Sequence, residues 1–211
     1  MLITQPLERV FITSDHHFGH ANIINYANRP FVNLQEMDEN LIAAWNSVVK
    51  PDDWVYHLGD FTLGDIADAR KYLLRLNGII NILFNPWHHD KRWLSNRHVG
   101  IQNDLVIGVQ DDLTSKYYPI TLVMPVEILE ISKLTVDGRA KPVVLCHYPF
   151  ASWDRSHYQS WHLFGHCHNQ YRPNGLSMDV GVDAAYKVLG VYRPFSLAEI
   201  ANILSHRSNL D

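Results

Sequence analysis

The sequence predicts an α/β fold in which helices cover β-sheets. Short runs of apolar and β-branched residues recur along the chain and end in polar residues, a pattern typical of buried strands. Two stretches with helical spacing of apolar residues alternate with these runs in the first half of the chain. With 211 residues and 46% hydrophobic composition, the chain is long enough to bury a substantial core, so we expect one domain over residues 1–211.

Six apolar runs are the predicted strands. They are Val10–Thr13, Trp54–Leu58, Ile79–Phe84, Leu105–Val109, Val143–Cys146 and Leu163–Phe164. The stretch from Leu105 to Val136 is rich in strand-forming residues and has no helical pattern, so it predicts antiparallel hairpins.

Three helices are predicted from their start signals. The first covers 33–49, where an Asn33 cap and Glu36 precede apolar residues at helical spacing. The second covers 65–76 and is closed by Asn77-Gly78, which suits a left-handed C-terminal cap. The third begins at the capping box formed by Ser196 and Glu199 and runs to about Leu204.

Charge and composition limit the function. A net charge of -4 argues against general affinity for long nucleic acids, which depends on many Lys and Arg side chains. There is no signal peptide pattern in Met1–Val10 and no apolar run that could span a bilayer, so we expect a soluble, cytoplasmic protein. Cys146 and Cys167 fit a reducing compartment and are interpreted as core residues, although one disulfide between them stays open. The sequence does not predict the oligomeric state.

Side chains that can bind metals follow the predicted strands. Open α/β sheets place ligand sites at the carboxyl ends of their strands, and histidine, of which the chain has 13, is the commonest metal-binding side chain. Each of these motifs alone also fits an ordinary polar turn, but their common position indicates a metal site. The motifs are Asp15-x-His17, Gly59-Asp60, His88-His89-Asp90, His147 and His166-x-His168.

The order of these motifs resembles that of the calcineurin-like metallophosphoesterases. The resemblance extends from Phe11 to about Asp183. It is closest to small bacterial and phage phosphoesterases that have an Asp-x-His-Phe-Gly-His-x-Asn-Ile-Ile opening, here Asp15–Ile24, and a His-Tyr-Pro-Phe segment, here His147–Phe150. It implies a four-layer αββα sandwich with two mixed sheets and a dinuclear metal site at the strand C-terminal ends.

The resemblance also implies roles for individual residues. One metal would be held by Asp15, His17 and His168, the other by His147 and His166, with Asp60 between them. His89 matches the family's catalytic histidine, and Asp90 matches the carboxylate that orients it. The mixed nitrogen and oxygen ligands suit two divalent transition-metal ions, with manganese favoured and Fe, Zn, Ni or Co as alternatives.

The chain departs from the family at one ligand. The family has Gly-Asn-His-Asp where this chain has Trp87-His88-His89-Asp90, so His88 occupies the position of the Asn ligand. An alternative alignment with about two extra loop residues would bring in Asn85. We favour His88, because imidazole is an ordinary donor to divalent transition metals.

The implied activity is that of a hydrolase: a phosphatase or phosphodiesterase in which a metal-bridging hydroxide attacks a small, nucleotide-like phosphoester. Candidate substrate-binding residues near the metal motifs in sequence are His20, Asn22 and Arg155. The basic, aromatic segment 91–98 could receive a nucleotide, although we favour a solvated helix face there. The alternatives are a nuclease of the same fold, a non-catalytic scaffold and a purely structural metal site.

Overall fold

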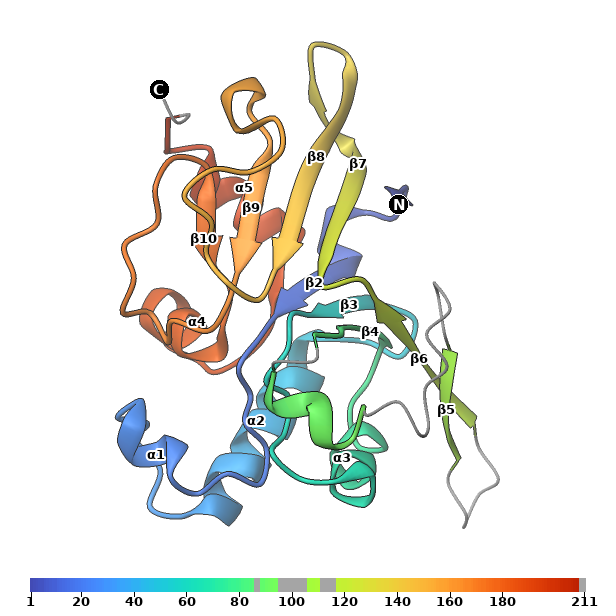
Figure 1. The fold of residues 1–211 in the computed structure, drawn as a ribbon, viewed down its shortest axis with the longest axis vertical. Helices are drawn as coiled ribbons and strands as arrows, with labels where there is room; N and C mark the ends of the chain where they lie inside the picture. Colours follow the sequence, from blue (N-terminus) through green and yellow to red (C-terminus); the bar gives the residue numbers. More distant parts are fainter. Residues whose placement is uncertain (86–87, 95–105, 111–116, 209–211) are drawn as a thin grey trace.

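The computed structural model describes residues 1–85, 88–94, 106–110 and 117–208, and it has an α/β fold with two mixed sheets (Figure 1). The strands are β1 (Leu2–Ile3), β2 (Val10–Thr13), β3 (Trp54–His57), β4 (Ile79–Leu83), β5 (Val106–Gln110), β6 (Tyr117–Val123), β7 (Val126–Val136), β8 (Arg139–Cys146), β9 (Trp161–Phe164), β10 (Ser177–Asp179) and β11 (Phe195–Ser196). The α-helices are α1 (Ile23–Tyr26), α2 (Leu34–Val48), α3 (Ile66–Leu73), α4 (Val182–Leu189) and α5 (Leu197–Leu204). Short 3-10 helices lie at Leu7–Arg9, His89–Arg92 and Ser156–Tyr158.

The two sheets differ in size and share a mixed topology. The six-stranded sheet has the order β11-β2-β3-β4-β6-β5, with β2, β3, β4 and β6 parallel and an antiparallel strand at each edge. The five-stranded sheet has the order β1-β7-β8-β9-β10, in which only β7 and β8 pair antiparallel. The predicted α/β class is therefore confirmed, and so is antiparallel pairing within 105–136, where β5 pairs with β6. β7 lies in the same stretch, but its antiparallel partner β8 lies beyond Val136.

Alternating side chains of the six-stranded sheet build two cores. Ile12 and Tyr56 face the other sheet and belong to one hydrophobic cluster with Leu145 and Leu163. Phe11 and Val55, the neighbours of Ile12 and Tyr56 in the chain, belong to the other cluster with Met37, Leu41 and Trp45 of α2. A strand that is buried on both faces has apolar residues throughout, which explains why these runs were recognisable in the sequence.

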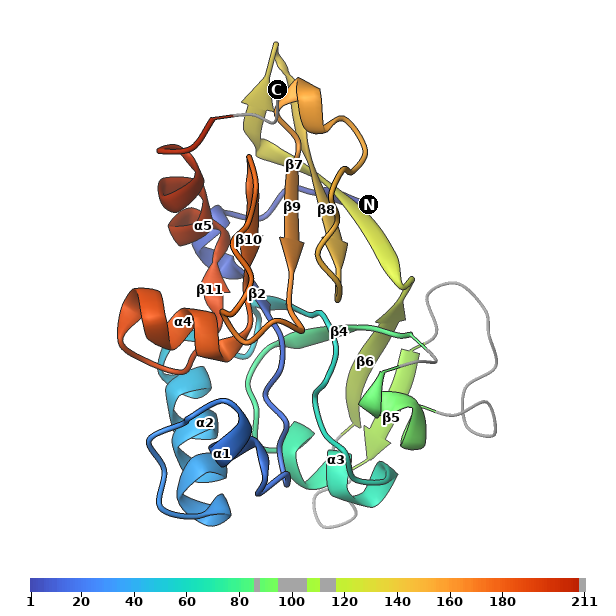
Figure 2. The ribbon, with the colours of Figure 1, turned by 60° about the vertical axis from the view of Figure 1, so that its left-hand side comes forward.

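The helices near the five-stranded sheet are placed differently from the four-layer arrangement. Residues Leu197 and Ile200 of α5 join the cluster between the sheets, and Figure 2 shows α5 beside β10 and β11. On the outer face of β9, Phe150 stacks on the His162 ring at 4.8 Å, and Trp153 lies 5.5 Å from that ring. Among the described residues, a loop segment therefore covers β9 where the four-layer arrangement expects a helix.

The predicted helix starts are confirmed. The Asn33 side chain accepts a hydrogen bond from the Glu36 amide at 2.9 Å, and both α3 and α5 begin with a complete capping box. α3 ends at Leu73, three residues before its predicted end, and its C-cap is Leu74 in the right-handed helical region. Gly78 has a positive φ of 109° but lies beyond this cap, so the predicted left-handed cap at Asn77-Gly78 is wrong. The sequence did not predict α1, α4 or the short strands β1, β10 and β11. No helix in the described part of the chain is long and apolar enough to cross a membrane.

The two sheets meet at one edge of the molecule. Ser14, just after β2, forms a parallel bridge with Gly181, which lies between β10 and α4. The Val182 amide donates to the Ser14 carbonyl at 3.1 Å, and the Gly165 amide, just after β9, donates to the His147 carbonyl at 2.9 Å. The carboxyl ends of strands from both sheets are thereby joined, and the predicted metal ligands follow these ends.

Candidate metal centre

Six predicted ligands lie in two groups at the meeting edge of the sheets. The ligand atoms of Asp15, His17 and His168 all lie within 4.8 Å of one another. The same holds for Asp60, His147 and His166. Each group combines residues from both sheets, since His147 follows β8 and His166 and His168 follow β9, whereas Asp15 follows β2 and Asp60 follows β3.

The Asp60 carboxylate links the two groups. Its Oδ2 atom lies 3.7 Å from Nε2 of His17 and 3.5 Å from Nε2 of His147. Nε2 of His17 also lies 3.9 Å from Oδ1 of Asp15. These distances are too long for good hydrogen bonds. They fit atoms that converge on a shared ion, because donors about 2.0 to 2.2 Å from one metal are separated by roughly 3 to 4 Å.

The backbone at the ligands is held in an unusual conformation. Asp15, His17, Asp60, His166 and His168 have φ between 45° and 68°, in the left-handed region that non-glycine residues rarely adopt. Such residues cost about 1 to 3 kcal/mol each and persist only where the surroundings impose them. At Asp15, His17 and Asp60, hydrogen bonds between the two loops help to hold this conformation, from the Asp15 amide to the Gly59 carbonyl at 3.1 Å and from the His17 amide to the Asp60 carbonyl at 3.0 Å.

Buried ligand atoms without hydrogen-bond partners test whether the residues fit a metal. Oδ1 of Asp15, both ring nitrogens of His17 and of His88, and Nδ1 of His147 are buried and have no partner in the described structure. An unsatisfied buried polar atom costs about 1 to 3 kcal/mol, so a cluster of them is unexpected unless another group binds there. The set of imidazole nitrogens and carboxylate oxygens is the donor chemistry of divalent transition metals, and the residues therefore fit such ions.

The protonation states of these histidines also fit metal binding. Burial lowers the pKa of His17 well below its usual value, lowers that of His88 to about 4, and lowers that of His147 to about 2. All three imidazoles are therefore neutral at pH 7, which is the state that binds a metal. Burial also raises the pKa of the Asp15 and Asp60 carboxyls, an effect that a nearby cation would reverse.

A buried ion pair orients one ligand. Nδ1 of His168 lies 2.6 Å from Oδ2 of Asp183, which leaves Nε2 of His168 available to a metal. Arg29 donates to both Asp183 oxygens, at 2.9 and 2.8 Å, and also to the Asp15 and His16 carbonyls. Burial opposes protonation of His168, but the hydrogen bond to Asp183 and the negative charges of Asp15 and Asp183 together outweigh it and raise the pKa of His168. Such outer partners fix the orientation of metal-binding histidines.

Glycine is required where the ligands pack against the backbone. A Cβ atom on Gly59, which has φ of 116°, would lie 2.7 Å from Cε1 of His88 and 3.2 Å from Nδ1 of His147. A Cβ atom on Gly181 would lie 2.8 Å from Oδ2 of Asp15. Any side chain at these positions would push a ligand out of place.

His88 lies with the second group. Its ring centroid is 4.1 Å from that of His147, and it forms a further possible ligand set with Asp60 and Asp90. Asn85 is also buried, at 8% exposure, and has a partner in the structure. Both ring nitrogens of His88 are without a partner, so His88 stays the favoured candidate for the seventh ligand.

The role expected for Asp90 is wrong. Its carboxylate accepts hydrogen bonds from the Phe61 and Thr62 amides and from Nε1 of Trp93, at 2.8 to 3.1 Å. No hydrogen bond joins it to the His89 imidazole in the described structure, so Asp90 holds the turn after Asp60 instead of orienting His89. The His89 side chain is exposed, its ring lies 5.8 Å from that of His17, and its amide donates to Oδ1 of Asp60 at 3.2 Å.

The three candidate substrate residues have different positions. The His20 ring lies 5.8 Å from that of His17, and Asn22 is exposed at the start of α1, so both lie on the side of the first ligand group. Arg155 was predicted wrongly. It pairs with Glu130 and lies with Val136 and Arg139, at the end of β8 farthest from His147.

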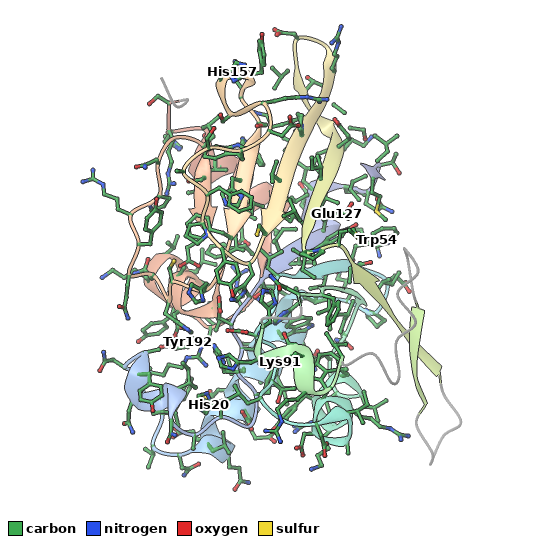
Figure 3. All side chains as sticks on the ribbon, in the orientation of Figure 1. His20, Trp54, Lys91, Glu127, His157 and Tyr192 are labelled. Atoms are coloured by element: carbon green, nitrogen blue, oxygen red, sulfur yellow. The ribbon has the colours of Figure 1, made fainter. Side chains whose placement is uncertain are left out.

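The position of Arg155 can be followed from His157, which lies two residues later in the short 3-10 helix. Figure 3 shows His157 at the end of the molecule opposite His20 and Lys91.

The segment proposed to receive a nucleotide is only partly described. In the basic segment 91–98, Lys91 and Arg92 are exposed, while Arg97 and His98 lie outside the described residues.

Sequence reasoning missed Arg29 and Asp183. Asp183 had a usable signal, because Ser177–Asp183 repeats the order of strand, glycine and carboxylate found at Val55–Asp60. Arg29 had none, since it lies in a loop where no periodic pattern places its side chain.

Comparison with known proteins gives the fold but no activity. No family model matches the chain. A segment of 87 residues is 47% identical to the uncharacterized protein MJ1445 of Methanocaldococcus jannaschii, covering 40% of this chain and 48% of that protein. A segment of 58 residues is 38% identical to the gene 66 protein of Mycobacterium phage L5, covering 28% of each chain. The matches thus span about half or less of these relatives.

One solved structure is similar over nearly its whole length. The crystal structure of AQ665 from Aquifex aeolicus, a protein of unknown function, has a TM-score of 0.53 and 20% identity, covering 92% of this chain and 98% of that one. At this identity the likeness concerns the fold alone.

Proposed function

We propose that this protein is a metallophosphoesterase of the calcineurin-like type, with two divalent metal ions, that hydrolyses a small phosphomonoester or phosphodiester. The observation that supports this most directly is the position of Asp60. One of its oxygens lies within 3.7 Å of a histidine from each of the two ligand groups, which is the arrangement of a carboxylate that bridges two ions. The order of motifs along the chain agrees with the same proposal.

The ligand groups fit two ions, with manganese favoured and Fe, Zn, Ni or Co as alternatives. Asp15, His17 and His168 would hold one ion, His88, His147 and His166 the other, and Asp60 both. When bound, such a pair of ions acidifies water and stabilises negative charge on phosphoryl oxygens. This is the chemistry needed to hydrolyse a phosphate ester.

His89 is the proposed proton donor to the leaving oxygen. It is exposed and follows the metal ligand His88, so a substrate bound at the ions could reach its imidazole. General acid catalysis of this kind is typically worth about 100- to 10,000-fold in rate. Asp90 contributes through Asp60, because it fixes the amides of the turn that follows this bridging residue.

A purely structural metal site is a weaker explanation. Structural sites are closed and usually four-coordinate, whereas this site combines two ligand groups and has an exposed ligand, His166. An ion with an exposed ligand is open to a substrate. A nuclease would need a basic channel for a long polyanion, for which the net charge of -4 gives no support.

The proposal is tested with the full chain loaded with Mn²⁺ and assayed on p-nitrophenyl phosphate and on bis-p-nitrophenyl phosphate. We expect hydrolysis of at least one, loss of metal in Asp60→Asn, and full metal content with at least 100-fold slower turnover in His89→Ala. His157→Ala, a change of a distant exposed histidine, is the matched control. A single inert ion per chain with no hydrolysis of either ester would overturn the proposal.

A further inference from the structure

A pocket lies at the far end of the five-stranded sheet from the candidate metal ligands. Its volume is about 430 Å³, within the range of about 300 to 1,000 Å³ that is typical of small-molecule sites. The starts of β8 and β9 and the end of α5 form its walls, and β9 can be followed in Figure 1 from this end to the metal edge. The residues that matter most are Leu134, Lys141, Trp161, Leu176, Leu204 and Arg207.

This pocket is separate from the metal centre. Lys141 is in the first half of β8, and the ligand His147 follows the end of the same strand. Trp161 is the first residue of β9, and the candidate ligand His166 lies two residues after the end of this strand. Since a strand rises about 3.3 Å per residue, roughly 16 to 20 Å separates the two sites. A ligand in the pocket would therefore not contact the ions.

Two cations line the pocket without a carboxylate partner. Lys141 is only 9% exposed, and its ammonium group donates to the Gln159 carbonyl at 3.0 Å and lies 4.9 Å from the centre of the Trp161 ring. Arg207 donates to the Ser177 carbonyl. In the described part of the chain, neither side chain forms an ion pair. Each has several N–H groups left over, because a lysine has three and an arginine five.

The surroundings make these charges costly. Burial lowers the pKa of Lys141 and also that of Arg207, because a desolvated cation is disfavoured. The rest of the lining is mixed, with Leu134, Leu176 and Leu204 on its apolar part and Thr135, Gln159 and Ser205 on its polar part. Lys141 is buried, and a buried charge is normally paired, so an anion in the pocket would provide its missing partner. Arg207 is exposed and adds a second positive charge to the same lining.

We propose that this pocket binds a small amphipathic anion, with its carboxylate or phosphate group between Lys141 and Arg207 and its apolar or planar body against Leu134, Leu176 and Leu204. The two cations favour a negatively charged ligand, and the leucines favour a ligand with an apolar or planar group. Inorganic ions lack such a body and should bind more weakly than aromatic acids.

The test is a fluorescence titration of the metal-loaded full chain with 1-anilinonaphthalene-8-sulfonate, an amphipathic anion. We expect saturable binding at one site per chain, and a Kd at least 10-fold higher in Lys141→Met and in Arg207→Gln. Lys133→Met, which removes an exposed charge from the neighbouring part of β7, should change the Kd less than twofold. Thermal unfolding of each variant checks that the fold is kept.

Competition identifies the head group. Indole-3-carboxylate and phenylphosphonate, added separately, should displace the probe, and the stronger competitor identifies a carboxylate or a phosphate-type ligand. Inorganic phosphate should displace it poorly. Unsaturable binding, equal affinity in the two pocket variants and the wild type, or no displacement by either acid would overturn the proposal.

Discussion

Replacing Asp183 by Asn tests how much the metal centre depends on its buried ion pair. The Asp183 carboxylate accepts two hydrogen bonds from Arg29 and lies 2.6 Å from Nδ1 of His168. Asn has nearly the same shape but no charge, and only one of its two terminal atoms accepts a hydrogen bond. The change therefore removes the charge that orients His168 and leaves Arg29 partly unpaired.

Two separate losses follow from this change. Losing an outer-shell partner of a metal-binding histidine typically weakens metal binding by about 10- to 100-fold, or roughly 1.4 to 2.7 kcal/mol. Arg29 is 3% exposed, and breaking a buried ion pair costs about 3 to 5 kcal/mol. Because Asn keeps one acceptor for Arg29, we expect about 3 kcal/mol of lost stability in the metal-free protein.

Calorimetric titration with Mn²⁺ measures the first loss, and urea unfolding of the metal-free protein measures the second. Asp53→Asn is the control, since Asp53 is also buried and pairs with Arg9 at 2.7 Å, at the end of β3 opposite Asp60. This control should leave metal affinity unchanged. It should lower the free energy of unfolding by about 1 kcal/mol or less, because the Arg9 side chain is 47% exposed. Metal binding to Asp183→Asn with wild-type affinity and stoichiometry would refute the reasoning.

Three further predictions concern the ligands themselves. Gly59→Ala should lower the amount of bound metal near His88, because the alanine Cβ would lie 2.7 Å from Cε1 of the His88 ring. Elemental analysis measures this loss. His88→Ala should lose one ion and Asn85→Ala should keep both; the opposite result would exchange their roles. Because burial raises the pKa of Asp15, the folded metal-free protein keeps a proton there up to a higher pH than the unfolded chain does, and the stabilising effect of this proton is lost as pH rises through the folded-state pKa. A metal must displace this proton, so metal affinity should rise by up to about one log unit per pH unit below that pKa. Metal affinity that does not change with pH over the whole range in which the protein stays folded would contradict this.

The sequence predicted the parts of the site that follow from local patterns. Asp15 and Asp60 follow apolar strands that are buried on both faces, so both strands and their ends were recognisable. The pairing of Arg29 with Asp183 joins residues 154 positions apart, and no local pattern encodes such a contact. The misplaced Arg155 shows the same limit, because nearness in sequence to His147 did not bring it near in space.

The prediction that Asp90 orients His89 was wrong for a different reason from the one that applies to Arg155. Its place in the motif was carried over from a family pattern, whereas its partners are set by the turn at 61–62, which lies about 30 residues earlier in the chain. The placement of α5 also depended on tertiary packing, since its capping box and apolar face determine a helix but not which sheet face it covers.

The left-handed ligand residues have a consequence for how the two halves of the chain are held together. The His166 amide donates to Oδ2 of Asp15 across 151 residues, and Ser14 pairs with Gly181 beside it. Ions held by residues from both sheets would crosslink the two sheets at this contact and would close a loop that spans most of the chain. The free energy of metal binding would then offset the backbone strain at the ligands. Removal of the ions by a chelator would weaken the contact between the two sheets before either sheet unfolded.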